Sequence, residues 1–194
     1  MKLFTSLYTR VMSWSVHSKA PRYLAALSFA ESSFFPIPPD VMLAPMTAAQ
    51  PSKGLRFALI TTVASVMGGV FGYLIGLLGI EIIEPWLQAT AYWPRYLTVQ
   101  EWFDKWGVWV VFVAGFSPIP YKLFTISAGA LTLAIIPFLV ASFVGRGARF
   151  FLVAITIIWL GPRLEPMIRK YIEWLGWATV VVLVGTIVWY QRSG

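Results

Sequence analysis

Two apolar stretches, residues 23–50 and 107–133, are each interrupted near the middle by closely spaced prolines. Proline lacks an amide donor and clashes with the preceding turn, so a Pro-x-Pro pair ends a helix. The arms beside these pairs are also short: thirteen helical residues extend about 20 Å, against a hydrocarbon core of about 30 Å. Each stretch therefore predicts a re-entrant hairpin that enters the membrane and returns to the same side. The prolines at the two tips are Pro36 and Pro38, and Pro118 and Pro120.

Three other apolar runs are long enough to cross a membrane, or nearly so. They are residues 57–78, 138–160 and 174–190. The first of them carries three glycines at four-residue intervals, Gly68, Gly72 and Gly76. Small residues on one stripe let another backbone approach closely, so this stripe predicts tight helix packing.

Two segments have the mixed pattern of a membrane boundary. Apolar residues four apart in residues 1–20, with basic residues between them, predict an amphipathic helix lying on the interface. Aromatic and charged residues alternate irregularly over residues 81–106, which is typical of an interfacial segment. We expect Pro85 and Pro94 to prevent this segment from forming one helix.

Composition supports an integral membrane protein. Of the 194 residues, 58% are hydrophobic and only 12% are charged, about half of what a soluble domain carries. No polar linker divides the chain, so residues 1–194 form one membrane domain. The net charge of +7 is explained by basic residues at an anionic membrane surface, and no basic cluster with interleaved aromatics indicates nucleic-acid binding.

The charges of the loops predict the orientation. The N-terminal segment and the loop around residue 53 are basic, whereas residues 81–105 carry four acids and two bases. The positive-inside bias then places the N-terminus in the cytoplasm. It follows that the first hairpin enters from the cytoplasm and the second from outside. The predicted fold is all-α, with two inverted-repeat units of a hairpin plus a transmembrane helix, the interfacial helix and an extra C-terminal span.

Five ionisable residues lie inside apolar segments, where each costs about 2.5–3.5 kcal/mol at a helix centre. They are Glu31, Asp40, Lys122, Arg146 and Arg149. Three are cationic and two anionic, so an anionic ligand such as a phosphate would complete the set, and arginine suits phosphate. Internal ion pairing is the alternative: Asp40 with Lys122, and Glu31 with one arginine. A third interpretation makes Glu31 or Asp40 a proton site, since burial raises the pKa of a carboxyl group.

Enzymatic chemistry finds little support. The sequence has no cysteine, one histidine, no metal-ligand cluster and no glycine-rich phosphate loop after a strand. We therefore expect neither an enzyme nor a bound cofactor or metal.

The same residues carry a resemblance to the DedA family of small membrane proteins, also called the VTT-domain family. The motifs that carry it are Glu31 with Pro36-Ile-Pro-Pro-Asp40, Gly72-Tyr73-x-x-Gly76, Phe116-x-Pro118-x-x-Tyr121-Lys122, Ala128-Gly129, and Phe143-x-Gly145-Arg146-x-x-Arg149-Phe150. Many family members have arginine where Lys122 stands, and many have an aspartate in the glycine-rich span.

The resemblance implies a multi-pass protein of the bacterial inner membrane that supports membrane and envelope homeostasis. Its partners would be membrane lipids, among them a phospho-polyprenyl lipid, and protons. Whether the protein forms a homo-oligomer stays an open question. We expect a transporter or flippase of a phosphate-bearing lipid, dependent on the proton-motive force. Lys122, Arg146 and Arg149 would hold the phosphate. An uncoupled lipid scramblase and a non-transporting scaffold or assembly factor are the alternatives.

Overall fold

The computed structural model describes residues 3–90, 93–117 and 120–161, and within these ranges every regular element is a helix. The predicted span 174–190 and Pro118 lie outside the described residues. The helices are α1 (Leu3–Ser15), α2 (Ala20–Ser33), α3 (Asp40–Ala49), the short 3-10 helix η1 (Pro51–Lys53), α4 (Gly54–Gln88), α5 (Trp93–Trp106), α6 (Trp109–Phe116), α7 (Tyr121–Ala130) and a long helix at Ile135–Gly161.

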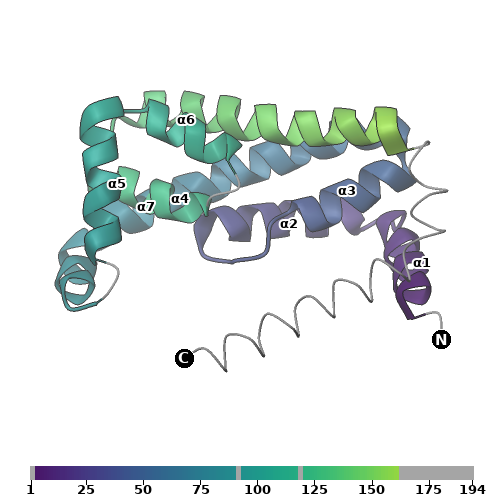
Figure 1. The fold of residues 1–194 in the computed structure, drawn as a ribbon, viewed down its shortest axis with the longest axis horizontal. Coiled ribbons are helices and arrows are strands. Elements are labelled where there is room, and N and C mark those ends of the chain that lie inside the picture. Colours follow the sequence, from purple (N-terminus) through teal and green to yellow (C-terminus); the bar gives the residue numbers. More distant parts are fainter. Residues whose placement is uncertain (1–2, 91–92, 118–119, 162–194) are drawn as a thin grey trace, which may run out of the picture.

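Two helical hairpins point toward the middle of the molecule from opposite ends (Figure 1). The first consists of α2 and α3, and the loop between them holds Pro36, Pro38 and Pro39. The second consists of α6 and α7 and turns before Tyr121. In the first hairpin α2 ends before Pro36 and Pro38, which cannot donate to the preceding turn. The two hairpins meet near their tips, where Lys122 at the start of α7 donates to the carbonyl oxygen of Phe34.

The two long helices run antiparallel beside the hairpins (Figure 1). A Cβ at Gly54 would lie against Ile158, and the ring of Tyr73 packs on Phe138 with centroids 5.1 Å apart. An early residue of α4 thus contacts a late residue of the 135–161 helix, and a later residue of α4 contacts an early one, as in an antiparallel pair. Residues 51–79 and 135–161 are long and apolar enough to cross a membrane, which agrees with the predicted spans at 57–78 and 138–160.

The glycine stripe of α4 packs against both hairpins, as the spacing predicted. A Cβ at Gly68 would collide with the carbonyl group of Phe29 in α2, and one at Gly76 with the carbonyl oxygen of Ile126 in α7. Helix α4 is therefore the backbone support that holds α2 and α7 at close range.

The molecule has an apolar outside and a partly polar inside. Its α4 helix exposes an apolar residue at almost every turn: Leu55, Leu59, Val63, Met67, Phe71, Leu74 and Leu78. Hydroxyl side chains are buried instead, among them Ser32, Thr61 and Ser65, each with no exposed surface. An exposed apolar stripe of this length is unusual for a protein surrounded by water and suits contact with lipid.

The prediction that the segment 81–106 does not form one helix is confirmed, but the break lies after Gln88 and not at Pro85. Helix α4 continues through this proline and ends at Gln88, and α5 then begins at Trp93 with Pro94 as its second residue. Proline is tolerated in the first turn of a helix, where its missing amide has no intrahelical partner. Near the end of α4, Pro85 removes a single backbone hydrogen bond, which the other turns of the long helix compensate.

Candidate functional site

The charged residues lie between two separate apolar cores. One core surrounds the base of the first hairpin and includes Leu24, Phe57 and Phe150; the other surrounds the second hairpin and includes Phe124 and Phe138. Between them is a cavity of about 170 Å³, enough for several water molecules or a phosphate group. It is lined by Glu31, Phe35, Pro36, Pro38, Pro39, Asp40, Pro120, Lys122, Arg146 and Arg149.

All five predicted charged residues therefore line one cavity, as do three of the four predicted hairpin prolines. The residues come from α2, the first hairpin loop, α3, the start of α7 and the 135–161 helix. The cavity thus lies where the two hairpin tips meet.

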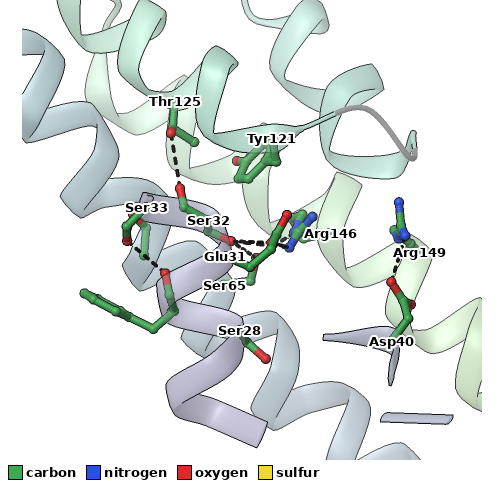
Figure 2. Close-up of polar contacts among 12 residues, drawn as sticks. Ser28, Glu31, Ser32, Ser33, Asp40, Ser65, Tyr121, Thr125, Arg146 and Arg149 are labelled. Atoms are coloured by element: carbon green, nitrogen blue, oxygen red, sulfur yellow. Dashed lines mark hydrogen bonds and ion pairs between the residues drawn. The ribbon is translucent and has the colours of Figure 1, made fainter. Parts of the chain in front are cut away.

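Arg146 is fully enclosed and bound by side chains (Figure 2). Its Nη2 forms an ion pair with Oε2 of Glu31 and donates to the hydroxyl of Ser32 at 3.3 Å. Its Nε donates to the hydroxyl of Ser65 in α4 at 2.5 Å. The side chain of Arg146 is 3% exposed and that of Glu31 12%. A buried arginine needs this degree of pairing, because an uncompensated buried charge is costly.

Aromatic rings complete the surroundings of Arg146. The guanidinium carbon lies 4.8 Å from the ring centroid of Tyr121 and 4.7 Å from that of Phe150. Such contacts attract a cation to the face of a ring and restrict its movement. The hydroxyl of Tyr121 is itself held by Ser142 at 2.5 Å. Arg146 is therefore fixed from α2, α4, α7 and its own helix.

Arg149 is more open and less completely bound. Its Nη2 donates to Oδ2 of Asp40 at 2.7 Å and its Nη1 to the carbonyl oxygen of Ser117 at 2.7 Å. The side chains of Arg149 and Asp40 are 20% and 24% exposed. Within the described part of the chain, Nε of Arg149 and Oδ1 of Asp40 are buried and have no hydrogen-bond partner.

Lys122 is the third cation of the cavity. Its ammonium group donates to the carbonyl oxygen of Phe34, at the tip of the first hairpin, at 3.2 Å. No carboxylate of the described residues forms a salt bridge with it. This contact links the two hairpin tips, and among the described residues it leaves the charge of Lys122 without a counter-charge.

The ion pairs correct one part of the predicted pairing and confirm another. Glu31 does pair with an arginine, Arg146. Asp40 does not pair with Lys122; it pairs with Arg149. Asp40 is the first residue of α3, which directs its carboxylate toward the 135–161 helix, whereas Lys122 lies at the start of α7 and reaches the first hairpin loop.

Several residues that hold the site were not predicted. Ser32 and Ser65 contact Arg146, and Tyr121 and Phe150, whose rings enclose it, were noted only as parts of motifs. The available signal was the presence of hydroxyl residues in runs that are otherwise apolar. Among the described residues, no group of three or more His, Asp or Glu side chains could hold a metal ion. The cavity offers cations, which suit an anion.

Comparison with known proteins agrees with this site. The VTT domain family matches residues 37–158, which include Asp40, Lys122, Arg146 and Arg149. The chain belongs to the VTT-domain (DedA) family. It is therefore a membrane protein, in agreement with its two long apolar helices.

Two similar relatives have no described function. An uncharacterized protein of Haemophilus influenzae is 47% identical over 184 residues, which cover 95% of this chain and 96% of the relative. An uncharacterized protein of Histophilus somni is 44% identical over the same share of each chain. A more distant relative is the undecaprenyl phosphate transporter A of Staphylococcus aureus, 30% identical over 97 residues, 47% of this chain and 48% of the relative. No solved structure gives a significant match.

Proposed function

We propose that this VTT-domain protein moves a phosphate-bearing lipid, undecaprenyl phosphate or a phospholipid, across the bacterial inner membrane. The observation that carries the proposal is the cavity between the hairpin tips, which is lined by three cations and two carboxylates. One positive charge is left over, and an anion would neutralise it. Arginine and lysine are the side chains that bind phosphate oxygens most strongly.

The depth of the cavity suits transport. Arg146 lies 11 residues after Ile135 and 15 before Gly161, about 16 and 22 Å along the helix axis. If the 135–161 helix spans the bilayer, the cavity lies near its midplane, where transporters built from inverted repeats place their sites. In this proposal the hairpins are re-entrant and enter from opposite faces, the N-terminus is cytoplasmic, and the two halves rock to expose the cavity to each side in turn.

The distant relative supports the substrate class. The Staphylococcus aureus protein bears the name of a transporter of undecaprenyl phosphate, a lipid with a terminal phosphate. We also propose that this transport depends on the proton-motive force. One of the two cavity carboxylates would take up and release a proton.

The proposal is tested by measuring movement of a fluorescent polyprenyl phosphate in vesicles that contain the purified protein. We expect Arg149→Ala and Lys122→Ala each to lower the rate about tenfold or more, because a hydrogen bond to a charged group contributes about 1.5–3 kcal/mol. Arg56→Ala is the matched control: Arg56 is exposed in the first turn of α4 and should leave the rate unchanged. Wild-type rates in both cavity variants would contradict the proposal.

A pH gradient across the same vesicles separates the alternatives. A proton-coupled transporter should move the lipid faster in one gradient direction than in the other. An uncoupled scramblase should be indifferent to the gradient, and a scaffold should move no lipid in either direction.

A further inference from the structure

The two ion pairs of the cavity differ in a way that suggests different roles. Nε of Arg146 donates to Ser65 and Nη2 donates to Ser32, and both serines are buried. The rings of Tyr121 and Phe150 lie against the guanidinium. Arg149 lies on the same helix three residues later, but its side chain is 20% exposed against 3% for Arg146, and Asp40 is 24% exposed against 12% for Glu31. An incoming anion can therefore reach Arg149 and Asp40 more easily than Arg146.

Among the described residues, buried atoms without a hydrogen-bond partner occur in the second pair and not in the first. Nε of Arg149 and Oδ1 of Asp40 are both buried without a partner among the described residues, and both side chains line the cavity. Buried polar groups are nearly always hydrogen-bonded in native proteins, so these two atoms indicate an additional occupant. Nε of Arg149 can donate a hydrogen bond to a phosphate oxygen, and protonation of Asp40 would turn its carboxylate into a donor as well.

We propose that the phosphate group of the transported lipid replaces Asp40 on Arg149, that Asp40 takes up one proton in the exchange, and that Arg146 stays bound to Glu31 throughout. This inference rests on the proposed function and adds to it the residue that couples protons to the substrate. Lys122, whose ammonium has only a carbonyl oxygen as its described partner, supplies the second cation for the phosphate.

The charges that face Asp40 explain why a proton would follow. Arg149 faces it from the 135–161 helix and Lys122 lines the same cavity from α7, while Arg146 and Glu31 line the cavity as a neutral pair. A phosphate monoester that takes both Arg149 and Lys122 brings two negative charges beside an unpaired carboxylate. Like charges at close range favour the neutral form of a carboxyl group, so Asp40 binds a proton. Two cations and a dianion then balance, with Asp40 neutral.

Proton uptake on binding is directly measurable. Farnesyl phosphate is titrated calorimetrically into the full-length protein in phosphatidylcholine nanodiscs at pH 8, where the monoester is already dianionic because its second pKa is about 6. Repeating the titration in buffers of different ionisation enthalpy gives the number of protons taken up. We expect about one for the wild type and none for Asp40→Asn. Asp104→Asn is the matched control: this exposed carboxylate of α5 lies outside the cavity and should preserve the uptake.

A second measurement on the wild type covers the case in which Asp40→Asn does not fold. Uptake of one proton makes the affinity fall about tenfold per pH unit between pH 7.5 and 8.5, by the same linkage that relates bound protons to stability. Affinity that does not change with pH, or full proton uptake in a folded Asp40→Asn variant, would overturn the exchange while leaving the proposed function in place. If the wild type binds no farnesyl phosphate at all, transport of a polyprenyl phosphate fails as the proposed function, and the exchange fails with it.

Inorganic phosphate, titrated in the same way, identifies the source of the anion. Proton uptake with farnesyl phosphate alone assigns the site to a lipid headgroup, and uptake with both probes assigns it to phosphate groups in general. Either result supports the exchange at Arg149.

Discussion

Arg146 and Arg149 lie three residues apart on one helix, and yet their surroundings differ more than their spacing suggests. Arg146 is bound to Glu31, Ser65 and Ser32, whereas Arg149 shares a partly exposed pair with Asp40. The first arginine therefore belongs to the core of the protein and the second to its accessible cavity.

This difference predicts unequal stabilities. Arg146→Ala leaves the buried carboxylate of Glu31 without its cation, which should lower the free energy of unfolding by about 3–5 kcal/mol. Arg149→Ala should lower it less, because water reaches the more exposed Asp40. Thermal unfolding of both purified variants in the same detergent checks the order. Equal losses would show that the two pairs are equivalent.

At this scale the sequence predicted the residues better than their partners. The five charged residues in apolar runs all line one cavity. A charge in contact with lipid is costly, and the hairpin tips provide a polar site away from lipid. Which acid meets which base depends on where each helix begins. Asp40 is the first residue of α3 and pairs with Arg149. Spacing along the chain alone does not predict this pair.

Among the elements, α4 determines how closely the hairpins approach. Its glycines contact the backbones of α2 and α7, so a side chain there would separate the helices. Thr125 of α7 adds a hydrogen bond to the carbonyl oxygen of Ser32 in α2 at 3.3 Å, directly beside the cavity. The position of the hairpin tips thus depends on the packing surface of α4.

Two glycine variants test this role. Gly76→Ala should destabilise the protein by about 1–3 kcal/mol, since its Cβ would collide with the carbonyl oxygen of Ile126. Gly147→Ala is the matched control, because its Cβ would meet only the methyl group of Thr62 at 3.6 Å, an ordinary contact. It should be neutral or stabilising by up to about 1 kcal/mol through helix propensity. Indistinguishable melting temperatures would contradict the packing role of α4.

Element types were predictable because hydrophobic runs and prolines act locally. The long spans, both hairpin turns and the glycine stripe follow from such signals. Pro85 shows the limit of local rules: the long helix α4 continues for three residues beyond it, where local propensity predicts a break. The hydroxyls that hold Arg146 were missed because a serine in an apolar helix has no signal that names its partner.

Over the whole molecule, the charged cavity separates two apolar cores, and the outer faces of the long helices are apolar. Two hairpins point toward the middle of the molecule from opposite ends (Figure 1), and residues near their tips line this cavity. In the proposed arrangement, each hairpin would bring polar backbone and charged side chains to a point within the membrane that is enclosed by protein.

In the proposed function, the two hairpins enter the membrane from opposite faces. The chain has no cysteine, so a single introduced cysteine reports its own position alone. Ser52 lies at the base of the first hairpin and Asp104 on α5, beside the base of the second, and both are exposed. Met67, exposed near the middle of the apolar span 51–79, serves as a lipid-facing control.

The most direct measurement is labelling of these three single-cysteine variants with a membrane-impermeant maleimide in intact cells and in inverted membrane vesicles. We expect Asp104→Cys to react only in intact cells, Ser52→Cys only in inverted vesicles, and Met67→Cys in neither. Labelling of Ser52→Cys and Asp104→Cys from the same face would contradict the opposed hairpins and, with them, the transport mechanism.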